Sequence, residues 1–328
     1  MRNVTNMKSG IAVAGTILVD KINEISSYPK SGELTQIKSV QKSVGGCVPN
    51  VAIDLKRICP DLTVKAAGKI GADENGEYVK NVLSDNGVNI ENISVGGDKT
   101  SFTEVMSVTG GQRTFFTYAG ASADFGVNDV GMSALNVKML HLGYFLLLDK
   151  IDNGDGEILL KKAKENGVKT SIDLVSESSG DFFKITSSAL KYCNYVIINE
   201  IEASSIANIP VRDDCGVLIE ENVKPIMQKL IDLGVKEKVI VHCPECGYLL
   251  SSNGEFTSVK SKKIPKGFIK GSVGAGDAFC AGSLYAFYNG YTDARTLEFA
   301  NLVAISCLSE KDSVSGIKSK EELEKIFF

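Results

Sequence analysis

A glycine-rich segment near the end of the chain has the residue types needed to hold an anion beside a base. It reads Gly271-Ser272-Val273-Gly274-Ala275-Gly276-Asp277 and runs into a segment with helical spacing. The first turn of a helix leaves backbone N–H groups without internal acceptors, and the helix dipole adds partial positive charge there. Such amides suit a phosphate or a phosphoryl group in transfer. The carboxylate of Asp277 could then accept a proton from an attacking hydroxyl.

The same heptad also fits a plainer interpretation, a glycine turn followed by an aspartate that caps the helix. The heptad alone leaves the two interpretations equally open. It is not a Walker A loop, because the chain contains no G-x-x-x-x-G-K-[ST] sequence.

Two further segments could recognise hydroxyl groups. Gly45 and Gly46 would allow the backbone to approach a ligand, and Asn50 offers both a donor and an acceptor. A loop with a helix cap explains these residues too, and in isolation it is the favoured reading. Asp20 closes the apolar run 17–19, so it is either aimed at a ligand or part of an ordinary loop.

Acidic residues follow one predicted strand. Asn199-Glu200-Ile201-Glu202 comes directly after the apolar run 195–198. In open α/β sheets ligands bind outside the carboxyl ends of the strands. Carboxylates there could hold Mg²⁺, usually through waters. A solvated helix start explains the same residues equally well. The segment 68–73, with its glycines and Asp73, reads only as a turn.

The cysteines suggest no clear site. Cys243 and Cys246 form the one C-x-x-C among eight cysteines, and the chain has two histidines, His141 and His242. A structural zinc site would need a second ligand pair. A redox pair is open as well, and the plainer reading is two thiols at a strand end and in its loop. No export signal is evident, so we expect reduced thiols and a cytoplasmic location.

Composition excludes two classes of partner. The 328 residues include 36 Lys and Arg against 40 Asp and Glu, a formal net charge of −4. A chain so balanced is a poor candidate for a general nucleic-acid binder. No apolar run approaches the ~20 residues needed to cross a bilayer, so we expect no membrane insertion.

The elements that must position these residues follow two patterns. Before residue 120 the chain favours strands, with a hairpin predicted from 100–108 and 113–118 around Gly110-Gly111. From about residue 137 strands and helices alternate, which is typical of an α/β fold with a mostly parallel sheet. The predicted strands are 11–14, 37–44, 138–142, 168–174, 195–198 and 239–242, and the predicted helices are 50–58, 77–83, 157–166, 223–233, 277–288, 297–308 and 321–327.

Taken in this order, the segments resemble the ribokinase-like, or PfkB, carbohydrate kinase family. Gly274-Ala275-Gly276-Asp277 opening a late helix is the strongest mark, and the segment 45–50 is the second. The segments 113–121 and 199–202 support the match, which extends over most of the chain. The resemblance implies a ribokinase-like α/β fold, with a mostly parallel central sheet flanked by helices and a small β-sheet lid. It implies one domain over 1–328, its lid strands drawn from about 15–44 and 100–120.

The resemblance also implies a reaction, the ATP-dependent transfer of the γ-phosphoryl group to a hydroxyl of a sugar or sugar derivative. Asp277 would be the base, and the amides of Gly274, Ala275 and Gly276 would form the anion hole. Mg²⁺ would be held by Glu202 through water. Further residues carried over are Asp20, Gly45, Gly46, Asn50 and Arg113 for the acceptor, and Asn199, Glu202, Ser272 and Gly247 for the nucleotide.

The chain departs from the family pattern at several points. Where the family usually has Asp-Thr, it has Gly271-Ser272, so the resemblance does not support activation by a monovalent cation. Pro244 replaces part of a nucleotide-binding turn, and Gly143 stands where ribokinases carry an acid, which argues against ribose. Leu18 replaces a polar residue, and Asp173-Leu174-Val175 replaces an Asp-x-Asn sequence.

Two other functions remain open at this point. A nucleoside kinase is one, because aromatic residues such as Phe115, Phe116 and Tyr118 could stack on a base. A sugar-binding regulator without turnover is the other, motivated by Gly271 and Pro244, although a pure binder would not need Asp277. The exposed edges of a small lid sheet also make a homodimer plausible.

Overall fold

Nine strands form one large sheet in the part of the chain that the structure describes. The computed structural model describes residues 8–108, 113–131, 136–176 and 181–327. The strand order is β13-β12-β11-β10-β9-β8-β1-β4-β5, and all neighbours are parallel except the pairs made by β12. The strands are β1 Ile11–Gly15, β4 Val64–Gly71, β5 Asn89–Gly96, β8 Met139–Phe145, β9 Lys169–Leu174, β10 Tyr195–Asn199, β11 Lys238–His242, β12 Cys246–Ser251 and β13 Phe256–Lys260.

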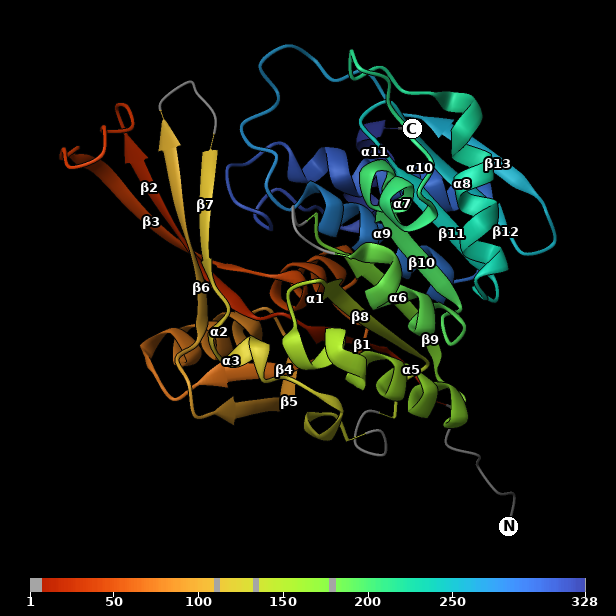
Figure 1. Cartoon of the computed structure of the whole chain (residues 1–328), viewed down its shortest axis with the longest axis horizontal. Helices are drawn as coiled ribbons and strands as arrows, with labels where there is room; N and C mark the ends of the chain where they lie inside the picture. The colour runs from red at the N-terminus through yellow and green to blue at the C-terminus, as the bar shows by residue number, and fades with distance from the viewer. Residues whose placement is uncertain (1–7, 109–112, 132–135, 177–180, 328) are drawn as a thin grey trace.

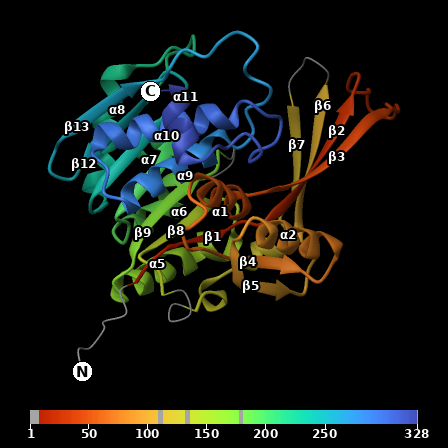
Figure 2. The same cartoon turned by 180° about the vertical axis from the view of Figure 1, so that it is seen from behind.

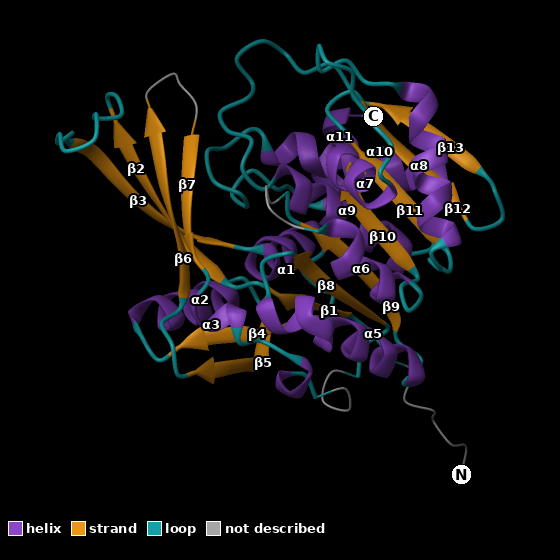
Figure 3. Cartoon of the chain, viewed as in Figure 1, coloured by secondary structure: helices purple, strands orange, loops and turns teal. Residues whose placement is uncertain are grey.

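Helices cover both faces of this sheet, as Figure 3 shows. In β1, Ala12 and Ala14 pack into one core while Ile11 and Val13 pack into the other. This double burial explains why the strand reads as a continuous apolar run. One face carries α5 Gly156–Glu165, α6 Phe182–Leu190, α7 Glu200–Ala207 and α8 Glu220–Asp232; the other carries α1 Cys47–Ile58, α2 Glu74–Asp85, α9 Ala275–Tyr288, α10 Asp293–Cys307 and α11 Lys320–Phe327. Short helical turns occupy α3 Gly120–Ala123, η1 Val127–Asp129 and η2 Ile151–Asp155.

A second sheet of four strands, the lid sheet, projects from the side of the molecule (Figures 1 and 2). Its order is β3-β2-β6-β7, with β2 and β6 parallel and the outer pairs antiparallel. Its strands are β2 Leu18–Ile25, β3 Ile37–Gly45, β6 Ser101–Val108 and β7 Arg113–Tyr118. Both strands of the predicted hairpin are confirmed, and the Gly110-Gly111 turn between them lies outside the described residues.

The register of the lid sheet sorts its side chains onto two faces. Asp20 lies opposite Thr103 of β6, and Thr103 lies opposite Thr117 of β7. Two residues farther along each strand, Ile22 lies opposite Val105. Because side chains alternate along a strand, one face of the lid sheet presents both polar and apolar groups to the same side.

The predicted α/β class with a lid sheet agrees with this architecture, but several local predictions were wrong. The segment 68–73 is not a turn, because Gly71 ends β4 and Asp73 caps α2 by accepting from the amide of Gly76 at 2.9 Å. Strands β5, β12 and β13 and helix α6 were not predicted. Five helices also begin two to four residues earlier than expected: α1, α2, α8, α9 and α10.

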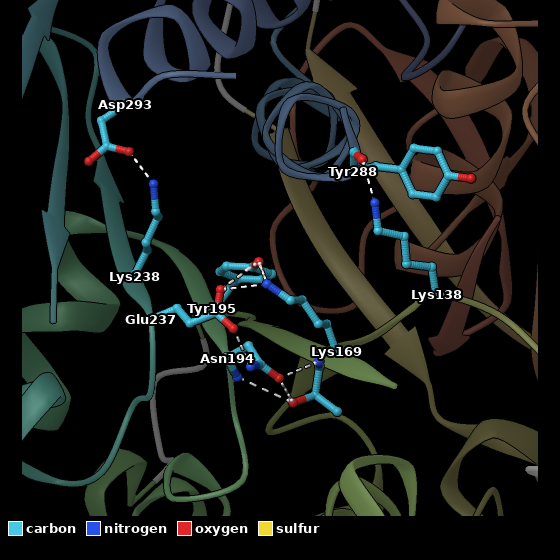
Figure 4. Close-up of polar contacts among 9 residues, drawn as sticks. Lys138, Lys169, Asn194, Tyr195, Glu237, Lys238, Tyr288 and Asp293 are labelled. Carbon is cyan, nitrogen blue, oxygen red and sulfur yellow. Dashed lines mark hydrogen bonds and ion pairs between the residues drawn. The ribbon is translucent and has the colours of Figure 1, made fainter. Parts of the chain in front are cut away.

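The amino ends of the parallel strands carry a set of ionic and polar contacts (Figure 4). Lys169, which opens β9, lies 2.7 Å from Glu237 Oε2 and donates to the Tyr195 hydroxyl at 3.0 Å. Lys238, which opens β11, is paired with Asp293 of α10. These contacts tie neighbouring strands together at one edge of the sheet. None of the described helices is both long and apolar enough to cross a bilayer.

Candidate active site

Helix α9 begins in a conformation that its sequence requires. Gly274 is the N-cap, with φ 79° in the left-handed region that favours glycine. A Cβ built there would lie 2.4 Å from Cβ of Ser313, so a side chain has no room. The helix starts at Ala275, and the amide of this residue has only a long 3.5 Å contact to Ser272 O. The turn therefore presents backbone N–H groups at a positive helix end.

Asp277 lies in the first turn of α9 and its carboxylate is held by two donors. Asn50 Nδ2 donates to Oδ2 at 2.8 Å, and the Tyr144 hydroxyl donates to the same oxygen at 2.9 Å. Asn50 is oriented in turn by the Ser313 hydroxyl, which donates to its Oδ1 at 2.7 Å. Oδ1 of Asp277 accepts no hydrogen bond from a described residue. One oxygen of this carboxylate is fixed and the other is available.

Burial gives two acids of the site unusual proton affinities. The pKa of Asp277 is raised to about 7, chiefly by burial and then by the charge of Asp173, against the opposing hydrogen bonds from Asn50 and Tyr144. The pKa of Asp20 is also raised to about 7, by burial and by the charge of Asp277. A carboxylate with a pKa near neutrality is well matched to take up and release a proton.

Asp277 lies where two cavities meet. A cavity of about 610 Å³ lies under the lid sheet, and one of about 500 Å³ lies at the carboxyl ends of β9, β10 and β11. The two share wall residues, so they are neighbouring parts of one cleft. The shared residues are Phe115, Tyr144, Val175, Ser176, Gly274 and Asp277.

Most of the predicted site residues line one of these cavities. Asp20, Gly46, Asn50 and Arg113 line the larger one together with Gly274 and Asp277. Asn199, Glu202, Ser272, Ala275 and Gly276 line the smaller one. The structure thus brings the two predicted groups to opposite sides of Asp277.

Gly45 and Gly247 line neither cavity. A Cβ at Gly45 would lie 2.3 Å from Asp20 Oδ2, so this glycine makes room for that carboxylate on the neighbouring strand. Gly247 lies within β12 against the side chains of Phe279 and Leu297. The nucleotide-binding prediction for Gly247 has no support from this position.

Sequence reasoning missed several residues of the cleft. Tyr144 follows Gly143 at the end of β8, has φ 61°, and donates its amide to Asp173 Oδ1 at 2.6 Å. Left-handed backbone at a non-glycine residue is uncommon and is found often at functional sites. His242 ends β11 and stacks on Phe279 with ring centroids 4.7 Å apart. Both Tyr144 and His242 stand at strand carboxyl ends, a position that could have singled them out.

The residues predicted for Mg²⁺ form a helix cap that also faces the smaller cavity. Asn199 Oδ1 accepts from the Glu202 amide at 2.9 Å, and Glu202 Oε2 accepts from the Asn199 amide at 3.1 Å. Glu202 Oε1 accepts from the Ser176 hydroxyl at 2.9 Å. Burial raises the pKa of Glu202 to about 8. Its oxygens keep further lone pairs, and an all-oxygen set reached through water fits Mg²⁺.

The two C-x-x-C thiols lie at the end of one strand and the start of the next, which is close to the plainer of the readings given above. Cys243 follows β11, Cys246 opens β12, and both are buried. The Cys243 thiol donates to the backbone oxygen of Cys246 at 3.2 Å. Within the described ranges, neither thiol belongs to a group of three side chains that could hold a metal ion.

The structure combines a large α/β sheet, a lid sheet over a cleft and a helix start that faces this cleft. The model of the pfkB family carbohydrate kinases matches residues 9–320. The chain therefore belongs to this family, and its fold is ribokinase-like, as the sequence predicted.

Named relatives agree with this assignment. The chain is 26% identical to a ribokinase of Arabidopsis thaliana over 320 residues, covering 96% of this chain and 80% of the relative. It is 26% identical to a 5-dehydro-2-deoxygluconokinase of Clostridium beijerinckii over 310 residues, covering 89% and 88%. The structure of Arabidopsis thaliana ribokinase complexed with ribose and ATP superposes with a TM-score of 0.80 at 23% identity, covering 98% of this chain and 99% of that one.

Proposed function

We propose that this protein is an ATP-dependent kinase that transfers the γ-phosphoryl group to a hydroxyl of a sugar or sugar derivative. The observation that carries the proposal is the position of Asp277 between the two cavities, with one free carboxylate oxygen beside the start of α9. An acceptor in the larger cavity and a triphosphate in the smaller one would meet at this residue.

The chemistry assigned to the site balances with these groups alone. The acceptor hydroxyl oxygen bonds to the γ-phosphorus, the bond from that phosphorus to the bridging oxygen breaks, and ADP leaves. The hydroxyl proton passes to Oδ1 of Asp277. Backbone N–H groups of 274–276 stabilise charge on the transferred group, because they are already oriented and need not reorganise. Asn50 and Tyr144 hold the base in place through Oδ2.

The nucleotide would lie along the carboxyl ends of β10 and β11. Asn199, Glu202 and Ser272 are the residues proposed to contact its phosphates and the waters around Mg²⁺. The ion supplies neutralisation of phosphate charge. We assign no monovalent cation.

The acceptor cavity offers hydroxyl partners and one cation. Asp20, Asn50 and Thr103 can bind hydroxyls. Arg113 forms no ion pair with a described residue and lines the same cavity, so acidic sugars belong among the acceptors to be tested. Phe115 offers a ring on which a base could stack, which keeps nucleosides as the second candidate class.

A panel assay tests the proposal. ADP release is measured with Mg-ATP over hexoses, pentoses, sugar acids and nucleosides, and we expect turnover with a sugar or sugar acid. Turnover with nucleosides alone would establish the second candidate. Binding of a sugar without turnover would overturn the kinase assignment in favour of a regulator. Asp277→Asn serves as the matched control, since it keeps the shape of the site and removes the base.

The outer face of the lid sheet suggests how two copies would associate. Val40 of β3 and Phe116 of β7 are 65% and 57% exposed. We propose a homodimer through the lid sheets, which light scattering of the parent and of Val40→Glu tests; an unchanged mass would overturn it. We also place the enzyme in a reducing cytoplasm, a location supported by its eight free cysteines.

A further inference from the structure

Three buried side chains behind the base converge on one point that the proposed phosphotransfer does not use. They are His141 of β8, Asp173 of β9 and Cys280 of α9, and their ligand atoms all lie within 4.8 Å of one another. His141 Nε2 lies 3.4 Å from Asp173 Oδ2 and 3.6 Å from Cys280 Sγ. The three residues are 0%, 6% and 2% exposed.

Hydrogen bonding alone accounts poorly for this convergence. Both Asp173 and Cys280 approach the same ring nitrogen, and in a neutral imidazole this atom carries either one proton or one lone pair. The other ring nitrogen, Nδ1, is already engaged with the Ser171 hydroxyl at 2.9 Å. If Nε2–H donates to Asp173, the Cys280 S–H has no acceptor on the ring; if Nε2 instead accepts from the thiol, it has no proton for Asp173.

A metal ion would satisfy all three groups at once. Ligands around tetrahedral Zn²⁺, with Zn–N and Zn–O near 2.0–2.2 Å and Zn–S near 2.3 Å, stand roughly 3.3–3.6 Å apart. The two separations from Nε2, 3.4 and 3.6 Å, match these ligand–ligand distances, and all three ligand atoms lie within 4.8 Å of one another. The Ser171 contact would fix the ring through Nδ1, as partners of the second nitrogen do for metal-bound histidines.

We propose that His141, Asp173 and Cys280 form a binding site for a borderline-soft divalent ion of the Zn²⁺ class. Nitrogen, oxygen and sulfur donors together favour such an ion over Mg²⁺, which selects oxygen. Asp173 and Cys280 also line the smaller cavity, which gives the ion an entry path. The Cys280 thiol gives up its proton to solvent as the ion binds. This site is separate from the oxygen site proposed for Mg²⁺ at Glu202.

Cobalt titration of the full-length, tag-free chain tests the proposal. Co²⁺ replaces Zn²⁺ in such sites and reports a bound thiolate by a charge-transfer band and tetrahedral geometry by strong visible bands. We expect both at one ion per chain, and we expect Zn²⁺ to displace them. Absence of a thiolate band in the parent chain overturns the site.

Variants identify which thiol is responsible. Cys280→Ala is expected to abolish the thiolate band, whereas Cys193→Ala, which removes another buried thiol outside the cluster, keeps it. The double variant Cys243→Ser, Cys246→Ser is expected to keep the band too. Persistence of the band in Cys280→Ala, or its loss in the double variant, overturns the assignment.

A second variant serves if Cys280→Ala fails to fold. Ser171→Ala removes the group that orients His141 and leaves all three ligands, and its folding is checked by thermal melting. We expect Co²⁺ affinity to fall about 10–100-fold, as it does when such a partner of a metal ligand is lost. Unchanged affinity in folded Ser171→Ala contradicts the proposed His141 geometry.

Discussion

Acidic side chains at the amino ends of the parallel strands are in a different electrostatic environment from those at the carboxyl ends. At the amino ends of the strands, Glu237 is paired with Lys169 (Figure 4). Partial burial pushes the pKa of Glu237 upward, but hydrogen bonds from Lys169 and Tyr195 leave it below the ordinary value. At the carboxyl ends, Asp277 and Glu202 form no ion pair with any described residue, and burial raises the pKa of each.

This difference separates charges that hold the fold from charges that do chemistry. A carboxylate that is paired with a cation already has its charge balanced, so it interacts only weakly with a ligand. A buried carboxylate without a cation is costly to the fold and is poised to bind a proton or a cation instead. The unpaired acids Asp277 and Glu202 therefore distinguish the carboxyl ends of the strands, which is where ligands bind in open α/β sheets.

Removing the base should have the largest effect. We expect Asp277→Asn to lower kcat by about 10²–10⁴, the usual contribution of a general base. Acceptor affinity, followed by calorimetry, should change little, because Asn keeps the size of the side chain. An unchanged kcat would show that Asp277 is not the base. The acids at the carboxyl ends of the strands would then differ from those at the amino ends only in their pairing, not in their function.

Removing one of the two donors to the base should have a smaller effect. Tyr144→Phe deletes the hydroxyl that donates to Asp277 Oδ2. A hydrogen bond to a charged group contributes about 1.5–3 kcal/mol, so we expect kcat to fall roughly tenfold. The lost bond also favours protonation of Asp277, so the acidic limb of the pH–rate profile should move to higher pH. A lower rate with an unmoved limb would mean that Tyr144 acts only on packing.

The pH dependence of the parent enzyme follows from the same carboxylate. Only the deprotonated form of Asp277 can accept the hydroxyl proton, and its pKa is raised to about 7. Turnover should therefore rise as the pH increases through 7, and below that point should fall up to about tenfold per pH unit. Because Asp20 titrates in the same range, Asp20→Asn is the control. Its rate is expected to be lower, and its acidic limb is expected to persist.

Breaking a pair at the opposite edge should have the smallest effect. Glu237→Gln removes the charge opposite Lys169, and both side chains are partly exposed. We expect the free energy of unfolding to fall by about 1 kcal/mol or less, measured by denaturant titration, with kcat unchanged. A large loss of activity would show that the amino edge is not merely structural.

Much of this fold was predictable because the core is periodic. The continuous apolar run of β1 and the alternating elements after residue 137 indicate burial on two faces. Such burial can be predicted because buried positions require apolar residues. Strand β5 and the exposed strand β13 carry no such pattern, because half-exposed edge strands tolerate polar residues. The segment 68–73 was misread because its lysine and glycines resemble a turn.

The site was predictable where backbone chemistry demanded a residue type. Gly274 and Asp277 indicate a helix start, and Asn50 follows two glycines. All three could therefore be identified from the sequence as candidate site residues. The contact between Tyr144 and Asp173 could not be predicted, because it joins two strands that become neighbours only in the folded sheet. Gly247 shows the reverse case, in which a carried-over position lines neither cavity.

Phe115 links the two halves of the cleft through a single lid strand. This residue borders both the cavity under the lid sheet and the cavity at the carboxyl ends of β9, β10 and β11, although β7 belongs to the lid sheet alone. Any displacement of β7 would open both compartments to bulk water together. Consumption of ATP by water in place of the sugar should therefore depend on whether an acceptor holds this strand down.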